Sequence, residues 1–71
     1  MPIEIRHRET GQTLHRLSQD TYRGANLSSL PLAYADFAGA DLRGAILDIA
    51  DLRHADFRGA RLESASLQNA N

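Results

Sequence analysis

The chain has 71 residues, no cysteine and a formal net charge of −1, from eight arginines and nine acidic residues. A protein this short buries only about 60% of the surface that its unfolded chain exposes, and no disulfide or thiolate-bound metal can add to its stability. A net charge near zero gives no general attraction to nucleic acid or to an anionic membrane, so the sequence predicts neither as a partner.

The N-terminal segment, residues 1–19, has a pattern of its own. Residues 3–5 alternate apolar and charged side chains, and a Thr-Gly pair then interrupts the pattern. This predicts a β-hairpin with its turn near residues 9–11 and His7 opposite Leu14. We expect the hairpin to cap the next segment, the alternative being a flexible arm. Without the apolar core of a signal peptide or a run of bilayer length, the chain is expected to be cytoplasmic.

From residue 20 to residue 71 the chain repeats every five residues. The first position is alanine in almost every repeat, and the fifth is most often Gly, Ser or Asn, as at a bend. The third position is always large and apolar. These third-position residues, which we expect to stack as the core, are Tyr22, Leu27, Leu32, Phe37, Leu42, Leu47, Leu52, Phe57, Leu62 and Leu67.

A period of five suits neither an α-helix nor a flat strand. On a helix, residues five apart point in directions that differ by about 140°, and on a flat strand an odd step alternates between the two faces. Each repeat must therefore combine a short extended stretch with a bend that returns the third residue to the interior. The first residue also points inward but lies close to a bend, where only a small side chain fits.

Repeats such as ADFAG, ADLRG, ADLRH and ADFRG resemble the motif Ala-(Asp/Asn)-(Leu/Phe)-X-X of the pentapeptide-repeat proteins. The leader IEIRHRETGQTLHRL is similar to that of some bacterial members. The resemblance implies an all-β fold, a right-handed quadrilateral β-helix with four repeats per coil. It divides the chain into a hairpin cap (1–19) and a β-helix of about two and a half coils (20–71). Four sides would stack Phe37 beneath Phe57.

The last coil has no comparable cap in the sequence. Its apolar end is expected to lie exposed and to pair with a second copy, giving an end-to-end homodimer. The residues expected at this self-association end are Leu52, Phe57, Leu62 and Leu67. Fraying of the last residues, or truncation of a longer chain, are the alternatives.

The titratable residues form no catalytic or metal-binding pattern, and no cofactor is expected. The histidines are expected to be solvated surface residues: His7, His15 and His54. Second-position aspartates are expected to accept hydrogen bonds from nearby backbone amides. Ion pairs are expected between stacked coils, from Asp41 to Arg61 and from Arg43 to Glu63. The arginines spread over several sides and alternate with acids, unlike a nucleic-acid-binding stripe.

Two repeats, LPLAY and AILDI, depart from the motif by placing apolar or aromatic side chains at outward positions. An exposed apolar cluster often marks a partner surface. The residues of the predicted partner surface are Pro31, Tyr34, Ile46, Ile49 and His54, the last stacked above Tyr34. The alternatives are that the hairpin covers them, or that they are isolated apolar residues on the surface.

The predicted function is that of a non-enzymatic structural or protein-interaction scaffold that associates with itself. A small solenoid lacks the cleft that catalysis needs. The alternative is a protein that mimics duplex DNA and binds a topoisomerase, as some members of the family do in quinolone resistance. That role needs a long acidic rod, whereas this coil is expected to be about 12 Å tall, or about 24 Å as a dimer.

Overall fold

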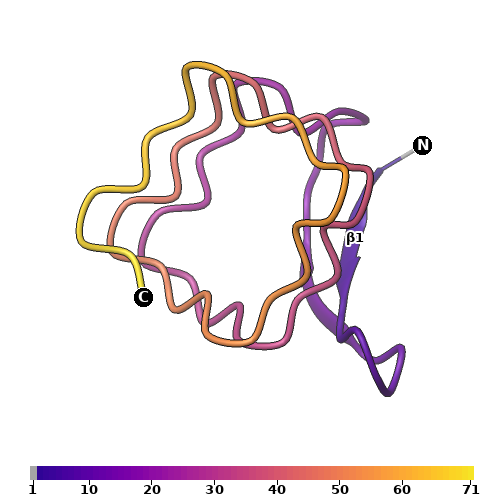
Figure 1. Ribbon diagram of the computed structural model, residues 1–71. Coiled ribbons are helices and arrows are strands. Elements are labelled where there is room, and N and C mark those ends of the chain that lie inside the picture. Colours follow the sequence, from indigo (N-terminus) through magenta and orange to yellow (C-terminus); the bar gives the residue numbers. More distant parts are fainter. Residues whose placement is uncertain (1) are drawn as a thin grey trace.

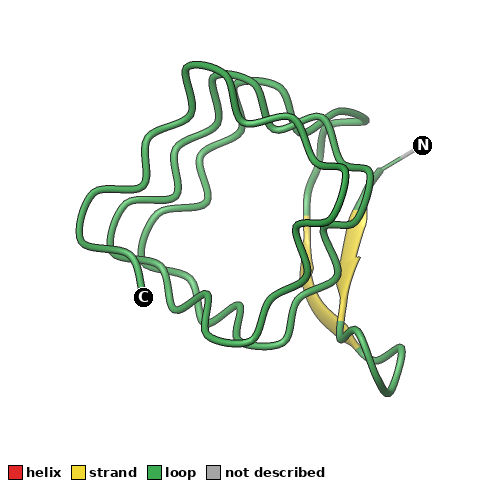
Figure 2. Cartoon of the chain, viewed as in Figure 1, coloured by secondary structure: helices red, strands yellow, loops and turns green. Residues whose placement is uncertain are grey.

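The computed structural model describes residues 2–71 as a coil whose successive turns lie on one another, with the N-terminal segment beside it (Figure 1). Within these residues there is no helix, and so none that could cross a membrane. The named strands are β1 (Glu4–Arg6) and β2 (Thr13–Arg16), which form an antiparallel two-stranded sheet. The coil itself consists of single-residue bridges and turns (Figure 2). The described chain is therefore a β-solenoid built from repeats.

Parallel bridges join residues that lie twenty positions apart. They pair Asn26 with Ile46, Pro31 with Asp51, Asp36 with Asp56, Asp41 with Arg61 and Ile46 with Ser66. One winding of the coil thus takes four five-residue repeats. The rings of Phe37 and Phe57 stack in one of these columns, with centroids 5.2 Å apart and an interplanar angle of 15°.

The backbone hydrogen bonds show why five residues form the unit. The second amide of a repeat donates to the preceding coil, as from Asp56 to the carbonyl of Ala35 (2.8 Å). The third amide donates to the following coil, as from Phe37 to the carbonyl of Asp56 (2.8 Å), and the fifth does the same. The bend closes when the next repeat's first amide donates to the third carbonyl, as from Ala40 to Phe37 (2.9 Å). Only the fourth amide still needs an acceptor.

The side chain in the second position supplies that acceptor. Asp36 Oδ1 accepts from the amide of Ala38 at 3.1 Å, and Asn26 Oδ1 accepts from the amide of Ser28 at 3.2 Å. The same bond, from the amide two residues later, recurs at Asp41, Asp51 and Asp56. This is the local role that the sequence predicts for the aspartates. A short acceptor is needed here because the extended stretch turns at the fourth residue.

The fifth position is where the chain turns the corner. From Gly24 to Asn69 every fifth-position residue has a φ between 58° and 73°. This left-handed conformation costs L-residues energy and suits glycine, serine and asparagine better than β-branched side chains. The conformation accounts for the residues that recur at this position, and it makes Ile49, with a φ of 64°, an outlier.

The core is one continuous cluster of stacked third-position side chains, with alanines at the bends. The third-position residues that are fully buried are Leu27, Leu32, Phe37, Leu42 and Leu47. Tyr22 is half-buried, and its ring meets that of Phe37 edge-on with centroids 5.6 Å apart. The hairpin contributes two further buried residues to the same cluster, Ile5 and Leu17. Its apolar side chains therefore lie against the interior of the coil.

The hairpin pairs in a register that differs from the predicted one. Ile5 lies opposite His15, but Arg6 lies opposite Thr13, because a bulge shifts the register between Ile5 and Arg6. The predicted pairing of His7 with Leu14 is therefore wrong. The amide of His7 donates instead to the carbonyl of Gln12 (2.8 Å).

The end of β1 also joins the edge of the coil. His7 forms an antiparallel bridge with Ala35, the amide of Asp36 donates to the carbonyl of Arg6 (2.8 Å), and the amide of Arg8 donates to the carbonyl of Tyr34 (2.7 Å). The carbonyl of Arg6 thus receives a second-position amide that would otherwise point to a preceding coil. The hairpin thus supplies hydrogen-bond partners to the backbone groups at the edge of the first coil, at Tyr34 and Asp36.

The opposite end of the coil is less covered. Leu67 is 42% exposed, whereas Phe57 and Leu62 are half-buried. Leu52, predicted to lie exposed at this end, is buried, with Ala70 packed against the cluster that contains it. Exposure of the predicted self-association end therefore increases along the chain toward Leu67.

Candidate functional site

The outer faces of the coil carry Asp-Arg pairs within single repeats. In each pair the arginine lies two residues after the aspartate and donates from both Nε and Nη2. The Nη2–Oδ2 distances are 2.7 Å for Arg43 and Asp41, 2.9 Å for Arg53 and Asp51, and 2.8 Å for Arg58 and Asp56. These bonds lower the pKa of each of the three carboxyls to about 2. The arginine charges on these faces are thus largely neutralised locally.

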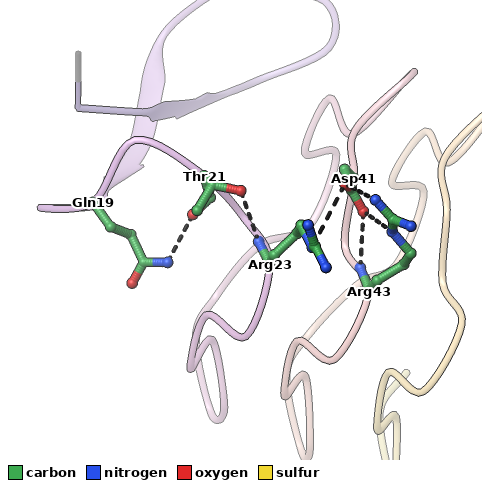
Figure 3. A network of polar contacts seen from close by, with 5 residues as sticks. All are labelled: Gln19, Thr21, Arg23, Asp41 and Arg43. Atoms are coloured by element: carbon green, nitrogen blue, oxygen red, sulfur yellow. Dashed lines mark hydrogen bonds and ion pairs between the residues drawn. The ribbon is translucent and has the colours of Figure 1, made fainter.

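This pairing replaces the predicted ion pairs between coils. In the described chain Asp41 binds Arg43 of its own repeat, and Arg23 of the preceding coil lies 3.9 Å away on its other side (Figure 3). The predicted partner Arg61 is paired with Asp41 through the backbone only. The local pair forms because the two side chains, two residues apart, lie on the same outer face of one repeat.

Three aromatic rings stack across the hairpin and two coils. The ring of Tyr34 lies between His7, with centroids 5.2 Å apart and planes 6° apart, and His54, at 4.8 Å and 20°. His54 thus stacks above Tyr34 as predicted. His7, however, is half-buried in this stack, so the expectation that it is a solvated surface residue is wrong. The faces of Tyr34 are occupied within the chain, which leaves mainly its edge for a partner.

The repeat at residues 45–49 breaks both local rules of the coil. Ile46 in the second position offers no oxygen to the amide of Asp48. Ile49 is a β-branched residue in the left-handed conformation, and it is 63% exposed; Ile46 is 38% exposed. Ile49 gains little burial in return for its backbone conformation, and more than a third of Ile46 is in contact with solvent. Residues that break a local rule without packing in return are candidates for function.

The side chain of Asp48, in the same repeat, acts as an acceptor for the next coil. Its Oδ1 accepts from the Ser66 hydroxyl and from the amide of Gln68 (3.1 Å). The carboxylate of Asp48 therefore serves a fourth amide that Ser66 would otherwise serve. This function of Asp48 escaped sequence reasoning, because its fourth position lies outside the motif; the departure of AILDI from the motif was the available signal.

Pro31 is exposed, but the coil explains it without a partner. The second amide of a repeat donates to the preceding coil, as from Asp51 to the carbonyl of Leu30 (3.0 Å). Pro31 lies in the first coil, beneath Asp51, where no preceding coil exists. A proline lacks that donor, so it leaves no unpaired amide at the edge and blocks the addition of another strand.

Metal ligands do not gather in the described part of the chain: residues 2–71 hold no group of three or more His, Asp or Glu side chains placed to share an ion. His15 lies in β2 opposite Ile5.

The predicted partner surface is therefore reduced to two residues. The ring stack accounts for Tyr34 and His54, and the edge of the coil accounts for Pro31. Ile46 and Ile49 are the two whose exposure the fold does not explain.

A comparison with protein-family models gives one match. The model described as Pentapeptide repeats matches residues 22–48 and 35–71, with eight copies of the repeat. No curated protein and no solved structure matches the chain.

Proposed function

Because the chain belongs to the pentapeptide-repeat family, we propose that it is a non-enzymatic protein-interaction scaffold that associates with itself. The proposal includes a right-handed four-sided coil of about two and a half turns. It also includes a capping role for residues 1–19, supported by the buried Ile5 and Leu17 and by the bonds of β1 to the coil edge. The observation that carries the function is the exposed pair Ile46 and Ile49, in a repeat that departs from the backbone rules of its neighbours.

Two surfaces have separate roles in this proposal. The partner surface centres on Ile46 and Ile49, with Pro31, Tyr34 and His54 at its margin. The self-association end consists of Leu52, Phe57, Leu62 and Leu67, and Leu67 is its most exposed member. An uncovered end of a solenoid offers both apolar side chains and free backbone groups to a second copy.

Self-association is tested by sedimentation velocity of the purified chain over a range of micromolar concentrations. We expect a dimer for the unaltered chain and for Ile49→Asn, and a monomer for Leu67→Glu. A monomer at every concentration for the unaltered chain contradicts the homodimer. Dissociation by Ile49→Asn instead of Leu67→Glu would move the contact to the partner surface.

The partner surface is tested by comparing proteins retained from cells of the native host by the unaltered chain and by Ile49→Asn. The variant is expected to fold at least as well and to lose a specific partner. A supercoiling assay with DNA gyrase tests the alternative function. Inhibition there would favour DNA mimicry over the scaffold. Against mimicry, the described chain measures only 29 × 27 × 22 Å, and the carboxylates of Asp41, Asp51 and Asp56 are each paired with an arginine.

A further inference from the structure

His7 is placed to make the attachment of the hairpin depend on pH. Its Nδ1 accepts from the backbone amides of Glu9 (3.1 Å) and Thr10 (3.3 Å). Amides can only donate, so Nδ1 carries a lone pair and the ring is neutral, with its proton on Nε2. The imidazole of His7 therefore closes the turn of the hairpin in the way that aspartates close the turns of the coil.

The same turn holds the hairpin to two coils. The His7 ring stacks on Tyr34 of the first coil, and the next residue, Arg8, donates from its amide to the carbonyl of Tyr34 (2.7 Å). The Arg8 side chain reaches further and donates from Nη1 to the carbonyl of His54 in the second coil (3.0 Å). A change in the turn around His7 is thus transmitted to Arg8, which bonds to both coils.

Protonation of His7 would act directly on the turn. Histidine changes charge between about pH 5 and pH 8. The incoming proton must bind Nδ1, at which two N–H groups already point, and a protonated imidazole has no acceptor left. Stacking of a charged ring on Tyr34 is itself favourable, so the stack does not oppose protonation. Protonation therefore acts by removing the acceptor to which the amides of Glu9 and Thr10 donate.

The charged surroundings of the turn come from both the hairpin and the coil. They include arginines on both segments, the carboxylate of Glu9 on the turn, and the carboxylate of Asp56, whose pKa the charge of Arg8 helps to lower. The groups are Arg6, Arg8 and Glu9 on the hairpin, and Asp36, Tyr34, Arg53, His54 and Asp56 on the coil. Arg6 and Arg53 are each paired with a carboxylate, Glu4 and Asp51. Because His54 is also a histidine, its contribution has to be separated by experiment.

We propose that His7 is a pH-sensitive latch: neutral, it closes the hairpin turn and holds β1 on the coil; protonated, it opens the turn and loosens β1. Two buried side chains of the hairpin segment, Ile5 and Leu17, would then lose part of their support. The inference concerns the attachment of the hairpin to the coil, and it does not require that a partner binds Ile46 and Ile49.

The test is amide hydrogen exchange by NMR between pH 8 and pH 5, expressed as protection factors. The informative amide is that of Asp36, which donates to Arg6 of β1. In the unaltered chain its protection is expected to fall about five- to tenfold on acidification, as for the loss of about one net hydrogen bond. The amide of Phe37, bonded to Asp56 within the coil, should keep its protection and serves as the internal control.

Two variants separate the histidines. His7→Asn keeps an oxygen acceptor near the place of Nδ1 but cannot titrate, so its Asp36 protection should not depend on pH. The double variant H15Q/H54F leaves His7 as the sole histidine and keeps an aromatic ring on Tyr34, so it should retain the pH dependence. A pH-dependent loss in His7→Asn, or constant protection in the unaltered chain or in the double variant, would overturn the proposal.

Discussion

Phe37 and Phe57 stack with their ring centroids 5.2 Å apart, yet Phe37 is fully buried whereas Phe57 is only half-buried. The two rings occupy equivalent positions in successive coils, so they differ in what lies beyond them. Phe37 has Phe57 on one side and also makes a T-shaped contact with Tyr22. Within the described chain, no third-position residue stacks on the far side of Phe57. The same residue in the same repeat position therefore contributes differently to stability.

Truncation of these two rings should show that difference. Phe37→Ala is expected to lower the free energy of unfolding by about 3–5 kcal/mol, the usual cost of removing a buried phenylalanine. Phe57→Ala is expected to cost less, because part of its surface already contacts solvent. Urea denaturation measures both. Phe37→Leu keeps most of the volume and allows the comparison if the alanine variant does not fold; equal losses at both positions would contradict the burial.

The left-handed fifth position makes opposite predictions for two residues. Ile49→Asn is expected to raise the free energy of unfolding by about 1 kcal/mol, because asparagine adopts a positive φ more readily than a β-branched residue. Gly44→Ala is expected to lower it by about 1 kcal/mol. At Gly44 an added Cβ would lie 3.8 Å from the nearest backbone atom, in ordinary contact, so the loss would report the backbone conformation alone. Thermal or urea denaturation measures both signs.

Destabilisation of Ile49→Asn would mean that the isoleucine packs within the chain. In that case the exposed pair would lose its value as evidence for a partner surface. The glycine variant serves as the control, since it must be destabilised whichever role Ile49 has.

Acid should destabilise the coil between about pH 5 and pH 2. The carboxyls of Asp41, Asp51 and Asp56 have a pKa of about 2 in the folded chain, whereas aspartates in an unfolded chain titrate near 3.9. Above that value both states are ionised and the stabilisation is complete. As pH falls toward 2 the unfolded chain binds these protons first, so the stabilisation is progressively lost.

The melting temperature measured from pH 7 to pH 2 checks this dependence. Asp51→Asn should flatten part of the acid limb, since the amide cannot titrate but still offers an oxygen to the amide of Arg53. High salt should reduce the effect at Asp51, whose side chain is 29% exposed, more than at Asp56, whose side chain is 7% exposed. An acid limb unchanged in Asp51→Asn would show that the Arg53 pair contributes nothing measurable.

Proline should be tolerated at position 31 but not at position 51, although the two positions stack in successive coils. Pro31→Ala is expected to change the free energy of unfolding by less than about 1 kcal/mol, because that position donates no bond to a preceding coil. Asp51→Pro removes the bond to the carbonyl of Leu30 and is expected to cost at least about 1–3 kcal/mol more than Asp51→Ala. Denaturation of the three variants measures the difference. Similar stability of the alanine and proline variants at position 51 would contradict the bond.

Period and residue type alone determined the local plan of the repeat. They identified the inward third position of residues such as Phe37, the bend at the fifth position and the amide-accepting role of aspartates such as Asp36. All of these depend on interactions within five residues, so the chemistry of one repeat is enough to reveal them. The repeated motif also led to the family.

Only the tertiary structure decided the contacts that join distant segments. The bulge after Ile5 and the stacking of His7 on Tyr34 cannot be read from a pattern of alternation. The approach of Arg23, rather than the predicted Arg61, to the carboxylate of Asp41 depends on how neighbouring coils lie on each other. Burial of Leu52, which the sequence predicted to be exposed at the end of the coil, depends on which neighbours lie above and below it. Such contacts are set by packing between residues far apart in the chain, which the repeat pattern of one sequence does not encode.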